Sequence, residues 1–202
     1  LIVGMVAKVG IETMGGLGAY MGTVILGLGI MLFVYTLILK FVAKRPMPST
    51  FSKFRNPQTL AFSTASSMAT MPMTLKTAEE DLKIDTRVSK FVIPLGTTVN
   101  MDGTALYQVI AAFFLAQLFA VELSLLSMLV IIITSLLASI GTPAVPGAGV
   151  IVLSTILITV GIPPVGILLL ISVDRILDMI RTMVNVTGDL TASCVFDKIT
   201  RD

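Results

Sequence analysis

Apolar runs long enough to cross a membrane dominate the pattern of this chain. Residues 14–39 carry no charged side chain, and a helix of about that length spans the hydrocarbon core of a bilayer. Residues 91–121 form a second long apolar run. A third run, between Glu122 and Asp174, is uncharged and long enough for more than two spans, so it must fold back on itself. The pattern predicts an all-α membrane protein.

Helix-breaking residues interrupt the second run near its middle, where a spanning helix should be least polar. They are Gly96, Asn100, Asp102 and Gly103. The five residues VNMDG at 99–103 resemble VNVTG at 184–188, so two broken helices are expected in related positions. A hairpin candidate precedes each of them. Duplicated units with interrupted helices are typical of inverted-repeat transport proteins, in which the binding site lies near the bilayer midplane.

Two segments are expected to be hairpins. The first lies within residues 56–90 and is rich in Ser, Thr and Met, so it is too polar to face lipid. The second lies within residues 122–163, where SIGTPAVPGAG at 139–149 contains two Pro and three Gly. Irregular backbone at such depth is tolerated only where protein covers it or where it lines a cavity.

These features divide the chain into five segments of one transport domain. The segments are leading helices with a basic loop (1–55), the first hairpin and its loop (56–90), the broken spanning helix (91–121), the second hairpin as a gate (122–163), and the last amphipathic spanning helix with its tail (164–202). The basic loop contains Lys40, Lys44, Arg45, Lys53 and Arg55. Because no acidic residue lies among them, this loop is expected on the cytoplasmic side.

Composition narrows the possible classes of function. Of the 202 residues, 55% are hydrophobic and 13% charged, with a mean hydropathy of +0.97, far from the values of a soluble domain. With no His and only Cys194, the chain has no His-based triad, His metal site or internal disulfide. A net charge of +2 gives no reason to expect a nucleic-acid partner. The apolar start at Leu1 lacks a basic region, so we expect no signal peptide and interpret the chain as part of a longer one.

The last apolar segment carries a stripe of polar side chains. Its members, spaced by three, one, three and four residues, are Asp178, Arg181, Thr182, Asn185 and Asp189. They share one face of a helix, which is costly inside a membrane unless they pair or meet a polar ligand. A carboxylate, a guanidinium and an amide together suit a zwitterionic solute with a further charged group. The alternative is a self-neutralised pair of Asp178 and Arg181 that only stabilises the helix bundle.

Hard oxygen ligands lie at both expected breaks. Asp102 and Asn100 would lie beside carbonyl groups of an unwound helix, and Asp189 follows Gly188. Small hard cations prefer such ligands, although a helix cap is the alternative for Asp102. The hydroxyl-rich segment 63–70 suits an anionic group at a helix N-terminus and, equally, a packed interface.

Three motifs occur in a specific order along the chain. They are NMDGT at 100–104, GT at 141–142 followed by VPGAG at 145–149, and DMIRTMVNVTGD at 178–189. In this combination the chain resembles the dicarboxylate/amino acid:cation symporters, a family that includes the glutamate transporters. The resemblance covers essentially the whole chain but only the carboxyl-terminal, substrate-binding half of the family's fold. It implies that both hairpins are re-entrant, so that each enters and leaves the membrane on the same side. It also implies a multi-pass protein of the plasma membrane, further scaffold helices of the same protein, and a homotrimer.

The resemblance also implies which residues bind an acidic amino acid. They are Ala65, Ser67, Thr104, Val145, Gly149, Asp178, Arg181, Thr182 and Asn185. Arg181 would receive the side-chain carboxylate and Asp178 the α-ammonium group, the latter helped by carbonyls of the two hairpins. Ser67 and Asn185 would hold the α-carboxylate.

Sodium ligands are implied in the same way. The first site would use Asp189 with the carbonyls of Gly96, Asn100 and Asn185. The second would use the carbonyls of Thr98, Ser139, Ile140 and Thr142. The third would use Asp102 with the side chain of Asn100, and an earlier helix outside this chain. Gln108 replaces a Glu associated with proton and potassium coupling in the family, so neither coupling is expected, and no organic cofactor is implied.

The predicted function is sodium-coupled symport of aspartate or glutamate by alternating access, without enzymatic activity. Three alternatives remain: an intramembrane aspartyl protease that uses Asp102 with Asp174 or Asp178, a proton-coupled dicarboxylate symporter, and a passive ion channel. Arg181 argues against the protease, because an aspartyl dyad shares one proton whereas a neighbouring guanidinium favours two charged carboxylates.

Overall fold

The computed structural model describes residues 11–201, and every regular element among them is helical, as predicted. The longer helices are α2 (Ile11–Phe41), α7 (Asp102–Leu118), α8 (Leu125–Ile140) and α10 (Ile167–Arg201). The shorter ones are α3 (Met47–Lys53), α4 (Arg55–Thr64), α5 (Ser67–Lys76), η1 (Thr77–Asp81), α6 (Thr86–Val99), α9 (Ala148–Thr159) and η2 (Pro164–Gly166). The expectation about the start of the chain at Leu1 falls outside the described residues.

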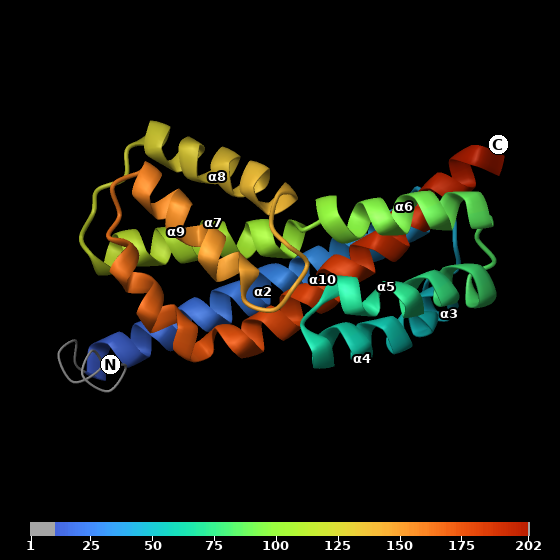
Figure 1. Ribbon diagram of the computed structural model, residues 1–202, viewed down its shortest axis with the longest axis horizontal. Coiled ribbons are helices and arrows are strands. Elements are labelled where there is room, and N and C mark those ends of the chain that lie inside the picture. Colours follow the sequence, from blue (N-terminus) through green and yellow to red (C-terminus); the bar gives the residue numbers. More distant parts are fainter. Residues whose placement is uncertain (1–10, 202) are drawn as a thin grey trace.

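Helix α10 is the element on which the rest of the molecule packs. It runs beside α2 along the long axis, and the end of α10 lies far from the start of α2 (Figure 1). Helices α7, α8 and α9 gather toward one end, and α3 to α6 toward the other. Because α10 contacts α2, α4, α5, α6, α7 and α9, it connects both groups.

Two apolar cores lie at the two ends of the molecule. The first includes Leu28, Leu115 and Leu177 from α2, α7 and α10. The second includes Ile93 and Leu190 from α6 and α10. Between Leu177 and Leu190, α10 buries most of its polar side chains. The polar layer is therefore held between two regions of close apolar packing, which fix its position.

The predicted break within residues 99–103 is confirmed, whereas the second predicted break is wrong. Helices α6 and α7 are separated by Asn100 and Met101, whose backbone angles are not helical. Helix α10 is continuous through residues 184–188. Its polar side chains find partners on the broken helix: Asn185 Oδ1 accepts a backbone N–H of α7, and Asp189 accepts a side-chain N–H of Asn100. The backbone of α10 therefore need not unwind to satisfy them.

Within the described range, two stretches are long and apolar enough to cross a membrane, Gly15–Phe41 and Thr86–Leu118. The second of these contains α6, the break and α7. Helices α8 and α9 form a hairpin through an irregular loop at residues 141–147, in which Gly147 has a φ of 78°. Helices α4 and α5 form a shorter hairpin through Ala65, which has a φ of 50°, and Ser66, which caps α5.

Candidate substrate and cation sites

The predicted polar stripe is buried on one face of α10. Its five members each expose less than a tenth of their surface: Asp178, Arg181, Thr182, Asn185 and Asp189. A sixth buried residue of this face, Asp174, was not among the predicted binding residues. It lies four residues before Asp178, so the same helical spacing identifies it.

Arg181 is held by two carboxylates of its own helix. Its Nη1 lies 3.1 Å from Oδ1 of Asp174, and its Nη2 lies 2.7 Å from Oδ1 of Asp178. The guanidinium carbon lies 3.7 Å from the centre of the Tyr107 ring, which makes a cation–π contact from α7. The self-neutralised pair considered as an alternative is thus present. It reaches the second hairpin, because Oδ2 of Asp178 accepts the N–H of Gly147 at 2.9 Å.

One N–H donor of the Arg181 guanidinium is unpaired among the described residues. Its Nε is buried and has no hydrogen-bond partner among the described residues. Tyr107, which supports the other face of this side chain, was not predicted from the sequence. Its position on α7, three residues after Thr104, is the only sequence signal that relates it to the site.

A small chamber lies where the two hairpin loops meet the broken helix and α10. Its volume is about 20 Å³, which suits about one water molecule. The lining residues are Ala65, Ser67, Met101, Thr104, Thr142, Pro143, Ala144, Val145, Gly149, Thr182 and Asn185. Every predicted substrate-binding residue except Asp178 and Arg181 lines it. Those two adjoin it, because Asp178 binds Gly147 and a Cβ on Gly149 would lie 3.5 Å from Nη2 of Arg181.

The two hairpin loops are hydrogen-bonded to each other across the chamber. Oγ of Ser66 donates to the carbonyl of Ala144 at 2.8 Å, and the N–H of Met68 donates to the same oxygen at 3.5 Å. Ser66 was not predicted, because its partner is 78 residues away in the chain. The two loops are therefore joined beside the chamber, which at about 20 Å³ is too small for an amino acid unless the α8–α9 loop moves.

Asp189 is a buried carboxylate, and no ion pair joins it to a cationic side chain in the described part of the chain. Its Oδ1 accepts Nδ2–H of Asn100 at 2.9 Å, and the same nitrogen lies 3.3 Å from the carbonyl of Asn185. Gly96 approaches so closely that a Cβ there would overlap the carboxylate. The structure thus brings together all four residues of the first predicted sodium site. A buried charge without a partner is costly, and oxygen ligands at one point suit a small hard cation.

Asp102 is the first residue of α7 and does not make the hydrogen bond of a helix cap, since α7 begins after Met101 without a capping side chain. Its Oδ1 accepts the N–H of Gly103 at 2.9 Å, and Asn185 Oδ1 accepts the same N–H at 2.9 Å. Asp102 also lines an apolar groove of about 400 Å³ formed by α2, α7 and α8. Over residues 11–201 no group of three or more acidic or Cys side chains gathers, so any cation site here depends on backbone carbonyls as well.

The residues of the second predicted sodium site lie near the ends of two helices in contact, α6 and α8. Thr98 is in the last turn of α6, Ser139 and Ile140 end α8, and Thr142 follows in the loop. The three hydroxyl groups donate to carbonyls of their own helices. Any ion at this place would therefore rely on carbonyl oxygens.

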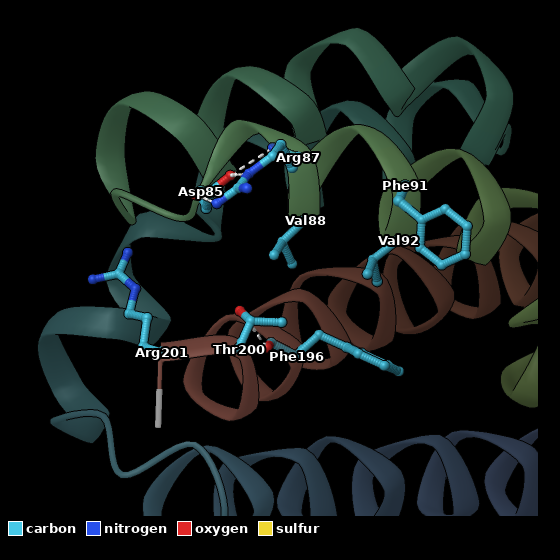
Figure 2. A pocket seen from close by; sticks show the side chains of 8 residues that line it. All are labelled: Asp85, Arg87, Val88, Phe91, Val92, Phe196, Thr200 and Arg201. Atoms are coloured by element: carbon cyan, nitrogen blue, oxygen red, sulfur yellow. Dashed lines mark hydrogen bonds and ion pairs between the residues drawn. The ribbon is translucent and has the colours of Figure 1, made fainter.

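A larger cleft, of about 510 Å³, lies between the start of α6 and the end of α10 (Figure 2). Arg87 on its rim makes two hydrogen bonds to Asp85, at 3.1 and 3.0 Å. These bonds, with the backbone N–H of Arg87, lower the pKa of Asp85 to about 2. Arg201 is bound to Asp197 and to the carbonyl of Lys83. Both guanidinium groups already have protein partners, and none of the predicted binding residues lines this cleft.

Residues 1–199 match the model of the sodium:dicarboxylate symporter family. The chain belongs to this family. Among its relatives, the putative sodium-dependent excitatory amino acid transporter glt-3 of Caenorhabditis elegans is 44% identical over 94% of the chain. Excitatory amino acid transporter 3 of Mus musculus is 42% identical over 92%, and excitatory amino acid transporter 2 of Homo sapiens is 45% identical over 86%. The chain spans 36% of the first two relatives and 30% of the third.

The family is one of integral membrane transporters, and the described part of the chain has two stretches long and apolar enough to span a membrane. The family and the relatives are transporters, not enzymes. The protease alternative is not favoured, because Asp174 and Asp178, one of which would have to share a proton with Asp102, both form ion pairs with Arg181.

Proposed function

We propose that this chain forms the substrate-binding part of a sodium-coupled symporter of aspartate or glutamate. The observation that carries the proposal is the buried guanidinium of Arg181, which adjoins a small chamber between two hairpin loops and keeps an Nε without a partner among the described residues. A guanidinium fork binds a carboxylate with two parallel hydrogen bonds. The names of the relatives, excitatory amino acid transporters, support an acidic amino acid as the substrate.

In the proposed complex the substrate replaces contacts that the protein now makes with itself. The side-chain carboxylate of the substrate takes the place of Asp178 as a partner of Arg181. Asp178 is then available for the α-ammonium group, together with carbonyls of Ala65 and Val145 in the chamber wall. The remaining proposed contacts, to the α-carboxylate and along the wall, come from Ser67, Thr104, Gly149, Thr182 and Asn185.

The first proposed sodium site is at Asp189. Asn185 links this site to the substrate. The side chain of Asn185 lies in the chamber and donates to Thr104 at 3.2 Å. Its carbonyl lies 3.3 Å from Asn100, at the cation site. An ion and a substrate that both order Asn185 raise each other's affinity by the same factor. Two further ion sites are proposed, at Thr98, Ser139, Ile140 and Thr142 and at Asp102 with the Asn100 side chain.

The hairpins support alternating access as the proposed mechanism. Helices α8 and α9 have 16 and 12 residues. At 1.5 Å per residue they are about 24 and 18 Å long, whereas the hydrocarbon core is about 30 Å thick. We therefore propose that both hairpins are re-entrant, that they belong to an inverted repeat, and that the α8–α9 loop is the gate. The first four segments each contain a helix that contacts α10 in the fifth, so the five would move as one unit apart from the gate loop.

The surroundings of this unit are part of the proposal. Large apolar side chains face outward, among them Phe33 on α2, Leu125 on α8 and Ile151 on α9, which are 61%, 75% and 74% exposed. Such surface suits lipid and the scaffold helices of the same protein. By the family resemblance, the assembled protein is proposed to be a homotrimer of the plasma membrane.

Calorimetric titration of the full-length protein tests the proposal. Aspartate and glutamate are titrated with and without sodium, beside Arg181→Ala and the control Arg87→Ala at an exposed arginine. We expect binding only in sodium, lost in Arg181→Ala and kept in Arg87→Ala. Binding that survives the loss of Arg181 would refute the substrate assignment. Binding without sodium that instead depends on pH would favour the proton-coupled dicarboxylate symporter.

A further inference from the structure

The hydroxyl group of Tyr35 is buried without a hydrogen-bond partner. Tyr35 lies on α2, exposes 8% of its surface, and its Oη has no partner within the described residues. A buried polar atom of this kind is uncommon in native proteins and calls for an explanation. The function proposed above gives this residue no role.

The Tyr35 hydroxyl and the side chain of Asn100 reach the same point on α10. A Cβ built on Gly188 would lie 2.8 Å from Oη of Tyr35 and 2.6 Å from Nδ2 of Asn100. Only a glycine leaves room for both groups here. The next residue along α10 is Asp189, whose carboxylate accepts the N–H of Asn100 at 2.9 Å. Tyr35 therefore lies beside the amide group that occupies the proposed cation site.

An ion at Asp189 would displace the hydrogen bonds of that amide. Nδ2 of Asn100 donates to two oxygens, Oδ1 of Asp189 and the carbonyl of Asn185. Both oxygens are proposed cation ligands, and an N–H group that points at them would also point at the cation. The amide must turn when the ion binds, and its donor then needs another acceptor.

We propose that Tyr35 is a positioning residue of the cation site, whose hydroxyl oxygen accepts the N–H of Asn100 once sodium has taken Asp189 and the carbonyl of Asn185. This inference rests on the proposed function. It accounts for the unpartnered hydroxyl, because the acceptor is used only in the ion-bound state. It also accounts for Gly188, because any side chain there would separate Tyr35 from Asn100.

Tyr35→Phe tests the inference, because it removes the hydroxyl and keeps the ring. Tyr20→Phe is the matched control: Tyr20 is also on α2, is 3% exposed, has an unpartnered hydroxyl and stacks on Phe114 at 5.0 Å. Sodium binding is measured in the absence of amino acid, as the rise in Tm with sodium in a constant-ionic-strength choline background. Loss of one net hydrogen bond corresponds to a roughly three- to tenfold weaker sodium affinity, expected in Tyr35→Phe and absent in Tyr20→Phe.

Two further readouts separate this role from a structural one. The Tm without sodium should be the same or higher in Tyr35→Phe, and Gly188→Ala should weaken sodium affinity in the same direction. Equal sodium titrations of Tyr35→Phe, Tyr20→Phe and the unaltered protein would overturn the inference, as would a protein that sodium does not stabilise at all. Weakened sodium binding in Tyr35→Phe in a protein that binds neither aspartate nor glutamate would support the inference and refute the proposed substrate.

Discussion

Replacing Gly96 with alanine would bring a methyl group into the carboxylate of Asp189. The added Cβ would overlap Oδ1 and lie 3.0 Å from Cγ of Asp189. That side chain is 1% exposed, so it has no open space into which to swing. The carboxylate must shift, and the 2.9 Å hydrogen bond from Asn100 is then lost or lengthened together with the arrangement of the proposed ion ligands.

The expected magnitude follows from one misplaced ion ligand, the carboxylate of Asp189, because the hydrogen bond from Asn100 is given up in any case when the ion binds. A close polar contact to a charged group contributes about 1.5–3 kcal/mol, and about 1.4 kcal/mol corresponds to a factor of ten in an equilibrium constant. We therefore expect the sodium affinity of Gly96→Ala to fall about 10- to 100-fold. Sodium is titrated at a fixed aspartate concentration by calorimetry, and aspartate is then titrated in saturating sodium. Because Arg181 is untouched, the second titration should change by no more than a few fold.

Gly29→Ala is the control for this substitution. A Cβ on Gly29, on α2, would meet no atom within 4 Å. This variant should match the unaltered protein in both titrations. If Gly96→Ala is folded and also gives an unaltered sodium midpoint, Asp189 is not a cation ligand and the proposed site is wrong.

Two other predictions concern contacts that the structure makes between distant segments. Ser66→Ala removes the hydrogen-bond donor to Ala144 and the cap of α5, each of which contributes about 1 kcal/mol. Amide hydrogen exchange at residues 141–147 should therefore become faster. Unchanged exchange would show that the bond from Ser66 to Ala144 does not hold the gate. Asp197→Ala removes a carboxylate, in a residue 2% exposed, that binds Arg45 and Arg201. Because both arginines are partly exposed and keep a carbonyl partner, stability should fall by about 1.5–3 kcal/mol, seen as a lower Tm. Glu80→Ala is the control: it breaks an exposed ion pair with an N···O distance of 3.9 Å and should lower stability by less than about 1 kcal/mol. An equal loss of stability in Glu80→Ala and Asp197→Ala would contradict the reasoning.

The sequence predicts the helical class and one of the two breaks because both depend on local polarity. Polar residues and Gly in the middle of residues 91–121 are incompatible with a lipid-facing helix, and the chain does unwind there, at Asn100 and Met101. The same reasoning fails at residues 184–188. There the polar groups face protein partners from the unwound segment, so a continuous helix is satisfied, and no local pattern reveals those partners.

The candidate site is predictable to a similar extent. Helical spacing places Arg181 and Asp189 on one buried face, and family motifs identify most of the chamber wall. The tertiary contacts of the site, in contrast, cannot be predicted from local sequence. Tyr107 beneath the guanidinium, Ser66 at the second hairpin and Tyr35 beside Gly188 each depend on how helices far apart in sequence pack together. Their side chains carry no periodicity that would distinguish them from ordinary core residues.

The continuity of α10 has a consequence for how this segment can evolve. Each residue of an α-helix turns the chain by about 100°, so one residue inserted between Asp178 and Asp189 would rotate the ion ligands away from the substrate ligands. Single substitutions on the outward side, such as at Ile176, which is 53% exposed, leave that relation intact. Related proteins should therefore vary in residue type along the outer face of α10 but keep its length between these two positions. Insertions and deletions should instead accumulate in connections such as residues 119–124, between α7 and α8.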